Sequence, residues 1–467
     1  MKHAPPLNQV AFSVLDLRRT EQWFREGCGL MPAGGSRRMM RGPIAARVQG
    51  LPGAASTCWW LVGRNPWLQF EFFQFERPIA RLMPLDFRPC DIGYTRIGLW
   101  VTDFDAALER LGRLGTTPLT PPIGAAGARR ACVRSPDGVF VELMETDPLP
   151  AAPGTEREGC GTAVRSVTLS VPDLDQTMAF FGGALGLPRS DVRLHDPGHE
   201  ALWNLAGART RSAVFTAGDV LVEGVQYLDP PGRPWPEGYR ISDQGILNIA
   251  FGARSHVDHV EIFKRAVAGG AQPNCRPFQL PGAGVVYVND PQGFSVELLW
   301  LKPGKQDRDW GFEPLPIEDR PPPDTHSVSR SVHVDAPPER AWTVMMDHEG
   351  MSTWSGFKPV TLERRGENDP NGRGAVRRLG SPLGAVLEEI TCAEEPRLIR
   401  YRVIEGSPFV CHQGEIQLKP VDGGTDITWT VRFRPRVPGT GALLARIFGR
   451  ALGTAMRDGL KRRMEQA

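Results

Sequence analysis

The chain has 467 residues, and its 55 lysine and arginine residues against 53 aspartate and glutamate residues give a formal net charge of +2. This near-neutral balance provides no long-range field to attract nucleic acid or an anionic membrane, so we expect a small-molecule or protein partner. The start, MKHAPPLNQV, lacks the apolar core of a signal peptide, and no stretch approaches the roughly 18 apolar residues that span a bilayer. We therefore expect a soluble, cytoplasmic protein whose eight scattered cysteines are reduced and mostly buried.

A repeat organises the first two thirds of the chain. The segment SPDGVFVELME returns later as NDPQGFSVELLW, and each places one glutamate in the middle of an apolar strand. Three landmarks recur about 155 residues apart, which indicates a duplication: Gln9 with Ser166, Glu71 with Glu223, and Glu142 with Glu297.

Each half contains a second, internal repeat. An alternating apolar strand followed by a helix cap and an amphipathic helix occurs in VAFSVLDLRRTEQWF, IGLWVTDFDAALERL, VTLSVPDLDQTMAFF and IAFGARSHVDHVEIF. The predicted N-caps are Asp16, Asp103, Asp173 and Ser255, whose side chains can accept hydrogen bonds from free backbone N–H groups. The sequence therefore predicts four repeats, each a strand, a helix and further strands.

Two polar, proline-rich stretches, 147–159 and 303–325, divide the chain into three parts. The second contains Trp310 and Phe312, so part of it is expected to pack on a domain surface.

From residue 326 onward the pattern predicts a strand, a helix that starts at Pro337 and Pro338, several antiparallel strands and a long terminal helix. The apolar residues of this last helix recur every four positions, as is typical of a helix that packs on a sheet: Leu444, Phe448, Leu452, Met456, Leu460 and Met464. We interpret its opposite, basic face as a solvated surface rather than a membrane-binding one: Arg446, Arg450, Arg457, Lys461, Arg462 and Arg463.

These motifs resemble known families. Residues 8–146 and 163–301 both resemble the vicinal oxygen chelate superfamily of glyoxalases, bleomycin-resistance proteins and extradiol dioxygenases, through the VAFSVLDL and VTLSVPDL openings, the middle strands FEFFQF and VEGVQYLDPPGR, and the endings DGVFVELME and QGFSVELLW. The resemblance implies that two βαβββ units pair into a curved sheet around a cavity.

Residues 326–467 resemble a START-like domain of the polyketide cyclase/dehydrase type (SRPBCC), through DAPPERAW, STWSGF, GRGAVRRLG and the terminal helix. This implies an apolar cavity under the last helix. The predicted fold is α+β, with tandem chelate-type domains at 1–147 and 160–303, a linker at 304–325, and a helix-grip START-like domain at 326–467.

Superfamily members that bind a metal ligate it with histidine or glutamine from the first strands and glutamate from later strands. Carried over by position, the first domain offers Gln9, Glu71, Arg96 and Glu142, and the second offers Ser166, Glu223, Asn248 and Glu297. Neither set contains histidine, the imidazole ligand that best selects a first-row metal.

Arg96 stands in the first set, where a permanently charged guanidinium would repel a metal ion. We therefore expect a metal-free first domain in which Arg96 replaces the charge of the ion and pairs with Glu71 and Glu142; the alternative is that this triad only satisfies buried charge. In the second domain Asn248 and two carboxylates could hold magnesium or manganese, but a degenerate, structural domain is the favoured interpretation.

Other candidates carry weaker signals. His256 and His259 lie in the first turn of a helix and are interpreted as surface histidines. His195 and His199 lie in the loop HDPGHE, without an evident carboxylate partner.

In the third domain, five residues are expected to project into the cavity and bind ligand: Trp354, Arg378, Glu389, Tyr401 and His412. Strand parity allows only one of Glu388 and Glu389 to point inward. For each of these residues, an outward orientation is the alternative.

The combined prediction is a metal-independent isomerase, cyclase or dehydratase, or a pathway accessory, that acts on a bulky apolar molecule such as a polyketide, an aromatic or a steroid-like compound. Glu142 or Glu71 would act as base and Arg96 would stabilise an enolate-like charge, while Gln9, Glu223, Asn248 and Glu297 would bind ligand. The alternatives are a protein that binds a hydrophobic compound without turnover, and a metal-dependent dioxygenase or glyoxalase-like lyase. The sequence predicts neither the ligand nor the oligomeric state.

Overall fold

The computed structural model describes residues 4–36, 38–152, 154–319, 322–381 and 384–466. The architecture is α+β, and the chain divides into two compact units, Met1–Pro321 and Pro322–Ala467, here called the N-terminal and C-terminal units. Within the described ranges, every helix is too short or too polar to cross a bilayer.

The first sheet of the N-terminal unit has ten strands. They run in the order β13-β15-β16-β12-β1-β5-β4-β2, with β14 paired to β15 and β3 to β4. Their bounds are β1 (Leu7–Ser13), β2 (Met31–Gly35), β3 (Met40–Arg41), β4 (Ala55–Val62), β5 (Gln69–Arg77), β12 (Gly245–Ala253), β13 (Gln272–Pro273), β14 (Phe278–Leu280), β15 (Ala283–Asn289) and β16 (Ser295–Leu301).

The second sheet has six strands in the order β10-β11-β9-β6-β8-β7. Their bounds are β6 (Gly93–Val101), β7 (Arg130–Arg134), β8 (Phe140–Met144), β9 (Thr162–Ser170), β10 (Arg209–Ala217) and β11 (Val220–Asp229). The expected βαβββ pattern is shortened in this sheet, because each repeat here has three strands. The segment that would form a fourth strand makes only an isolated β-bridge, Ile123 with Arg130 in one repeat and Arg189 with Phe215 in the other.

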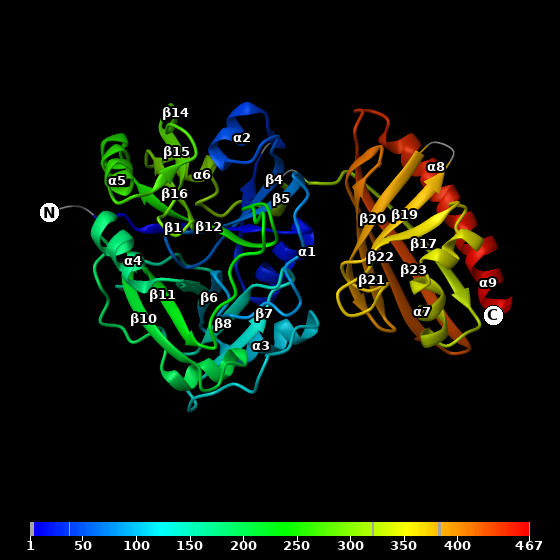
Figure 1. Cartoon of the computed structure of the whole chain (residues 1–467), viewed down its shortest axis with the longest axis horizontal. Helices are drawn as coiled ribbons and strands as arrows, with labels where there is room; N and C mark the ends of the chain where they lie inside the picture. The colour runs from blue at the N-terminus through cyan, green and yellow to red at the C-terminus, as the bar shows by residue number, and fades with distance from the viewer. Residues whose placement is uncertain (1–3, 37, 153, 320–321, 382–383, 467) are drawn as a thin grey trace. The chain divides into compact units, whose positions relative to one another are not determined.

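The four repeats pair differently from the sequence-based expectation. β1 pairs antiparallel with β12, which joins the first repeat to the fourth, and β6 pairs antiparallel with β9, which joins the second to the third. Figure 1 shows the blue strands β4 and β5 in one sheet with the green strands β12 and β16. The prediction that 1–147 and 160–303 each form their own paired sheet is therefore wrong. All four repeats open with the same strand pattern, so the pattern alone cannot select the partner of each.

The four predicted helix caps are confirmed. The side chains of Asp16, Asp103, Asp173 and Ser255 accept hydrogen bonds from backbone N–H groups two or three residues ahead. They start α1 (Leu17–Gln22), α3 (Phe104–Arg113), α4 (Leu174–Met178) and α5 (His256–Ala268). The remaining helical segments of the unit are η1 (Trp23–Gly27), α2 (Pro43–Gln49), η2 (Ala179–Ala184), η3 (Pro197–Trp203), α6 (Lys305–Asp309) and η4 (Ile317–Asp319).

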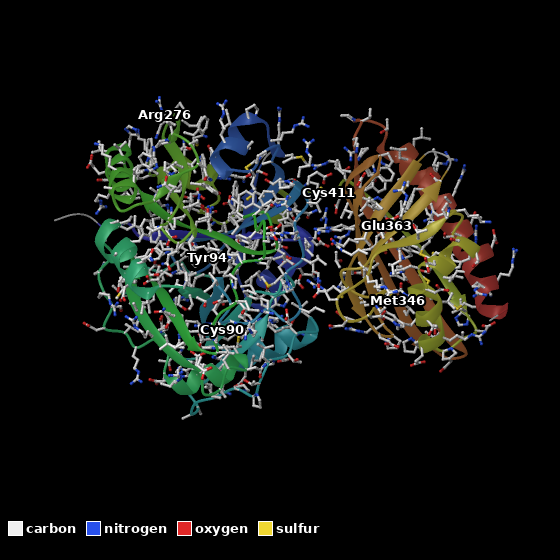
Figure 2. The ribbon with its side chains drawn as sticks, viewed as in Figure 1. Cys90, Tyr94, Arg276, Met346, Glu363 and Cys411 are labelled. Carbon is white, nitrogen blue, oxygen red and sulfur yellow. The ribbon has the colours of Figure 1, made fainter. Side chains whose placement is uncertain are left out.

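One continuous core joins both sheets of the N-terminal unit. It includes Phe12 and Phe72 from the first sheet and Ile97 and Val167 from the second. Tyr94 of β6, labelled inside this unit in Figure 2, donates its hydroxyl to the backbone oxygen of Ser295 in β16 at 2.7 Å. The two sheets therefore fold as one body.

The C-terminal unit is one antiparallel sheet with helices packed on it. Its strands follow the order β17-β23-β22-β21-β20-β19-β18: β17 (His326–Val334), β18 (Val360–Arg364), β19 (Val376–Ser381), β20 (Gly384–Glu394), β21 (Leu398–Glu405), β22 (Phe409–Val421) and β23 (Gly424–Pro435). Its helices are α7 (Pro338–Met346), η5 (Glu349–Thr353), α8 (Gly441–Thr454), η6 (Ala455–Leu460) and α9 (Lys461–Gln466).

The predicted apolar stripe of the terminal helix is confirmed. Leu452, Met456, Leu460 and Met464 are buried in the core of this unit, and Leu444 and Phe448 pack against it at the helix start. Figure 1 shows α8 and α9 running along the sheet.

Candidate functional site

The re-paired repeats place four polar side chains on one face of the first sheet. Ala11 lies opposite both Glu71 and Asn248, and Ala250 lies opposite both Gln9 and Glu297. Residues that lie opposite each other in neighbouring strands share a face. The two alanines leave room for the longer side chains, and we call Gln9, Glu71, Asn248 and Glu297 the acid-pair centre.

Glu71 receives three donors in this centre. Gln9 Nε2 lies 2.6 Å from its Oε2, while Trp60 Nε1 lies 2.9 Å and Cys58 Sγ 3.1 Å from its Oε1. Within the described chain, the contacts of Glu71 and Glu297 include no arginine, lysine or histidine side chain. The centre therefore contains two buried carboxylates without a compensating cation.

The missing cation changes the acidity of both groups. Burial raises the pKa of Glu71 to about 7, and the hydrogen bonds from Trp60 and Cys58 only oppose part of this rise. Burial and then the neighbouring charge of Glu71 raise the pKa of Glu297 well above its usual range. Two adjacent buried carboxylates cannot both ionise at low cost, so the pair holds at least one proton near neutral pH.

The acid-pair centre also has unsatisfied polar atoms. Gln9 Oε1 and Glu297 Oε2 are buried without a hydrogen-bond partner among the described residues, while Tyr287 and Asn248 lie close enough to Glu297 to oppose part of the rise in its pKa. Both unpaired atoms are oxygens that can accept a hydrogen bond, so they complement a ligand hydroxyl or the proton that the pair itself carries.

The resemblance to the vicinal oxygen chelate superfamily implies a metal ion at this place, and the residues depart from the ligand set that this resemblance implies. Asn248 stands where an imidazole ligand would be, and the three donors on Glu71 direct hydrogen atoms at oxygen lone pairs that a metal would use.

The second sheet holds a different centre, formed by Glu142, His195 and Glu223. His195 Nε2 lies 2.8 Å from Glu142 Oε2, and its Nδ1 lies 2.8 Å from Glu223 Oε2. The imidazole ring thus sits between two buried carboxylates, and its own side chain is only 8% exposed. We call this the imidazole centre.

One further cation and a hydroxyl support the imidazole centre. Arg130 Nη1 donates to Glu142 Oε1 at 2.7 Å, and Thr168 Oγ1 donates to Glu223 Oε2 at 2.9 Å. Burial alone would lower the pKa of His195, but the charges of Glu223 and Glu142 outweigh it and raise this pKa to about 9. Burial alone would raise the pKa of Glu142, but His195 and Arg130 hold it well below its usual range. The ring is therefore an imidazolium at neutral pH.

A metal does not fit the imidazole centre either. A metal ion needs one ring nitrogen and both carboxylates aimed at a common point, whereas the two nitrogens of His195 face different carboxylates. The ring itself fills the space between them, with a positive charge.

The expected pairing of Arg96 with Glu71 and Glu142 is wrong. Glu71 belongs to the other sheet, and Glu142 is held by Arg130 and His195. Arg96 instead donates from Nη1 to the Tyr227 hydroxyl at 2.9 Å, lies 3.6 Å from Glu223, and stacks 4.1 Å from the Trp203 ring.

The interpretation of His195 as a loop histidine without a carboxylate partner is also wrong. The segment after it forms η3, whose buried Trp203 donates to Glu200 at 2.7 Å, and the Tyr227 hydroxyl donates to the same carboxylate at 3.0 Å. The sequence DPGHEALW carries a signal of this, because a proline after Asp196 followed by buried apolar residues is typical of a packed helical turn. His259 was likewise expected at the surface, but it is buried and its Nε2 lies 3.1 Å from the Leu298 backbone oxygen.

In the C-terminal unit, four of the five expected residues are buried, and one of these four lies on the opposite face of the sheet from the core. Trp354, Tyr401 and His412 are buried, and burial lowers the pKa of His412 to about 4. Arg378 is exposed. Glu389 is buried on the face opposite Glu388, where Arg402 Nε donates to it at 2.8 Å.

The residues that point inward are the preceding neighbours of the two expected ones, Arg377 before Arg378 and Glu388 before Glu389. Arg377 lies opposite Glu388 and donates to it from Nε at 2.9 Å, while its guanidinium lies 5.2 Å from the Tyr401 ring. His348 Nδ1 lies 3.2 Å from Arg377 Nη1. The prediction that Glu388 and Glu389 lie on opposite faces of the sheet is confirmed. The choice of Glu389 as the inward residue was wrong, because alternation along a strand does not show which of its two faces is toward the core.

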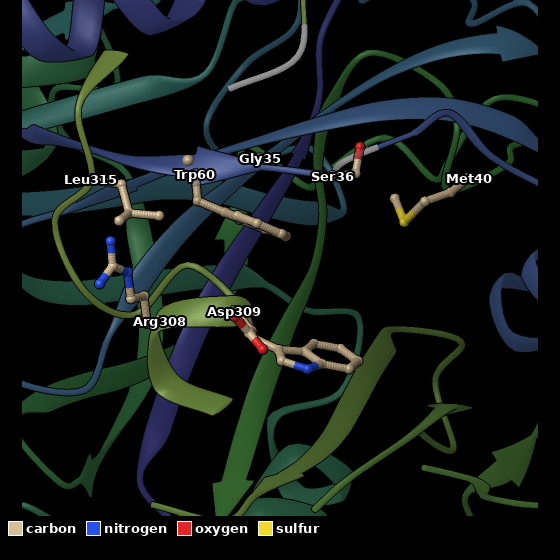
Figure 3. Close-up of a pocket in the computed structure, with 9 residues that line it drawn as sticks. Gly35, Ser36, Met40, Trp60, Arg308, Asp309 and Leu315 are labelled. Carbon is tan, nitrogen blue, oxygen red and sulfur yellow. The ribbon is translucent and has the colours of Figure 1, made fainter. Parts of the chain in front are cut away.

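Figure 3 shows a pocket of about 500 Å³, which we call the tryptophan pocket. It is lined by Gly34, Gly35, Ser36, Met40, Trp60, Arg308, Asp309, Trp310 and Leu315. Trp60 forms the shared wall, because its ring lines the pocket and its Nε1 donates to Glu71.

The segment after α6 closes this pocket. Gly311 adopts φ 76°, and a Cβ there would lie 2.4 Å from the Trp60 ring, so only glycine allows the chain to pass so close. Leu315 N donates to the Pro32 backbone oxygen at 2.9 Å, and Phe312 is buried, as predicted for this stretch.

Comparison with known protein families gives a match for the C-terminal unit. Residues 325–465 match the profile of the family described as polyketide cyclase/dehydrase and lipid transport. No curated protein matches the chain.

Solved structures resemble both units at low sequence identity. Glyoxalase I from Zea mays is 16% identical over 63% of this chain and 92% of its own, with a TM-score of 0.42. A putative dioxygenase from Bacillus subtilis is 13% identical over 69% of this chain and 93% of its own, with a TM-score of 0.46. A START superfamily protein from Mycobacterium smegmatis is 21% identical over 30% of this chain and 99% of its own, with a TM-score of 0.28.

Proposed function

We propose that the acid-pair centre is the reacting site of a metal-independent isomerase, cyclase or dehydratase that moves a proton on a small molecule. The observation that supports this most is a pair of buried carboxylates without a cation beside an open pocket. Perturbed acids in or beside a pocket are typical of catalytic sites. The family match of residues 325–465 supports a cyclase-type or ligand-binding role for the C-terminal unit.

The two carboxyl groups suit opposite roles in one reaction. Glu71, with a pKa near 7, is ionised in part of the molecules at neutral pH and can take a proton from an acidic C–H bond. Glu297 keeps its proton and can deliver it to a second atom of the substrate. Transfer of both protons gives an isomer; if the second atom is a hydroxyl, that oxygen leaves as water.

Neighbouring side chains hold Glu71 in place for this role. Gln9 and Trp60 donate to different oxygens of its carboxylate, which fixes the plane of the group. Asn248 and Tyr287 adjoin Glu297 and hold its carboxyl group in the same way. Glu142 and Arg96, which were predicted as catalytic, belong to the imidazole centre and take no part.

The lining of the tryptophan pocket defines the substrate class. The indoles of Trp60 and Trp310 suit a planar, largely apolar body, and Met40 and Leu315 extend this surface. Arg308 also lines the pocket, and within the described residues it forms no ion pair. We therefore propose an aromatic or polyketide-like substrate that carries a carboxylate or phenolate.

Binding can be tested without the natural substrate. The planar anionic dye 8-anilinonaphthalene-1-sulfonate should bind the wild type, and Trp60→Ala and Arg308→Gln should weaken binding about tenfold or more, since each removes a stacking or charged contact. Arg276→Gln serves as the control because Arg276 does not line the pocket. Equal binding by all four proteins would contradict the assigned pocket.

Turnover is tested by exchange of carbon-bound hydrogen in D₂O, followed by proton NMR on a panel of aryl ketone carboxylates. Glu71→Gln and Glu297→Gln should each reduce exchange by at least a hundredfold, while Glu261→Gln on α5 should leave it unchanged. The second candidate is a binding protein without turnover; it is favoured if the dye binds and no compound exchanges.

A further inference from the structure

A groove of about 250 Å³ lies on the C-terminal unit, where α8 and η6 pack against β17. It is lined by Arg330, Ser331, Gly449, Arg450, Gly453, Met456 and Arg457. Three guanidinium groups therefore face one concave surface that is distant in sequence from the centres described above.

Arg330 is held in a fixed position in this groove. Its Nε donates to the Gly449 backbone oxygen at 2.9 Å and its Nη1 donates to the Ser329 backbone oxygen at 2.7 Å. A guanidinium anchored through two nitrogens loses little further side-chain freedom when the third binds an anion.

The helix is shaped to admit this side chain. A Cβ at Gly449 would lie 2.6 Å from Arg330 Nη2, and one at Gly453 would lie 3.5 Å from Arg330 Nε. Glycine at 449 is therefore needed for Arg330 to lie against α8, although glycine weakens a helix interior by up to about 1 kcal/mol relative to alanine.

The three charges are not compensated by the protein. In the part of the chain that the structure describes, Arg330, Arg450 and Arg457 form no ion pair with a carboxylate. Three cations around one groove repel each other, and an anion that bridges them removes this cost.

We propose that this groove binds a phosphate-bearing anion, with Arg330, Arg450 and Arg457 as its ligands. Guanidinium groups recognise phosphate oxygens through paired hydrogen bonds. With about 30 Å³ for each water molecule, the groove has room for one phosphate group and several waters. The phosphate belongs either to a soluble ion or metabolite or to a lipid headgroup.

The test is calorimetric titration of inorganic phosphate into the full-length protein at about 50 mM salt, where screening is weak. Arg450→Gln/Arg457→Gln should weaken binding at least tenfold, because each charge-assisted hydrogen bond contributes substantially. Arg446→Gln/Arg462→Gln removes the same charge from the same terminal helix outside the groove and should change affinity by less than about twofold.

Gly449→Ala provides a variant that keeps every charge. The added methyl group displaces Arg330 Nη2, which is the end of the side chain and makes no contact that the fold needs, and alanine favours the helix, so the unit should fold while phosphate affinity falls about threefold or more.

Vesicles distinguish the two sources. Co-sedimentation with phosphatidylcholine vesicles that contain phosphatidate, prevented by the groove variants, would assign the lipid headgroup; phosphate binding without co-sedimentation would assign a soluble ligand. No phosphate binding, or equal losses in the groove and control variants, would overturn the proposal.

Discussion

Replacing His195 by glutamine should remove a pH-dependent contribution to the stability of the second sheet. The imidazolium lies between Glu142 and Glu223, and its pKa is about 9 in the folded protein against 6.5 for a free side chain. That difference corresponds to about 3 kcal/mol of stability.

The sign of the effect follows from the raised pKa. The folded protein holds the proton more tightly, so the stabilisation is complete below pH 6.5 and is lost as the pH rises through 9. In His195→Gln this dependence should disappear. At pH 6 the variant should also be less stable by about 3 to 5 kcal/mol, because two buried carboxylates lose their shared cation.

Hydrogen exchange of peptides from β8 to β11 measures this locally, and His256→Gln, which removes an exposed histidine, is the control. Equal protection of the wild type at pH 6 and pH 9.5, after correction for intrinsic exchange rates, would refute the imidazolium. So would a His195 pKa below 7 in histidine ring NMR.

Three further outcomes follow from the other buried groups. Because the pKa of Glu71 is raised to about 7, its protonated form stabilises the fold below pH 4.5 and this is lost as the pH rises to 7; Glu71→Gln should abolish that loss in urea unfolding curves, and unchanged curves would contradict it. Arg377→Ala leaves Glu388 buried without its partner and should cost about 3 to 5 kcal/mol in the C-terminal unit, whereas Arg378→Ala at the exposed neighbouring position should cost less than about 0.5 kcal/mol; similar melting temperatures for the two would reject the assigned faces. Gly98→Ala would place a Cβ 2.2 Å from Ser166 Oγ and should destabilise the second sheet by about 1 to 3 kcal/mol in hydrogen exchange, while Gly112→Ala, where no atom lies within 4 Å, should not.

Local chemistry made part of this fold predictable. A helix cap depends only on a hydrogen bond between a side-chain oxygen and a backbone N–H two or three residues ahead, so it can be predicted from a short segment. This holds for Asp16, Asp103, Asp173 and Ser255. The stripe that ends at Met464 was predictable for a similar reason, since helical spacing alone selects the buried face.

Long-range choices were not predictable in the same way. Nothing within the strand around Glu71 indicates that it shares a sheet with Glu297 rather than Glu142, because the four repeats have the same pattern. Arg377 and Arg378 differ by one position in an alternating strand, and only the neighbouring strands decide which one is buried. His195 reaches Glu142 and Glu223 from a connection whose path depends on the packing of Trp203.

The central claim, that Glu71 and Glu297 share protons rather than ligate a metal, is tested most directly by a pH titration of glutamate carboxyl carbons by ¹³C NMR. The glutamate carboxyl carbons are labelled with ¹³C. The titration is carried out once without metal and once with one equivalent of Mg²⁺ that is free of Mn²⁺. Two carboxyl signals should titrate at or above about pH 7 and be unaffected by Mg²⁺; one should be lost in Glu71→Gln and the other in Glu297→Gln. Two carboxylates that are already ionised at pH 5, or that become so when Mg²⁺ binds, would contradict it.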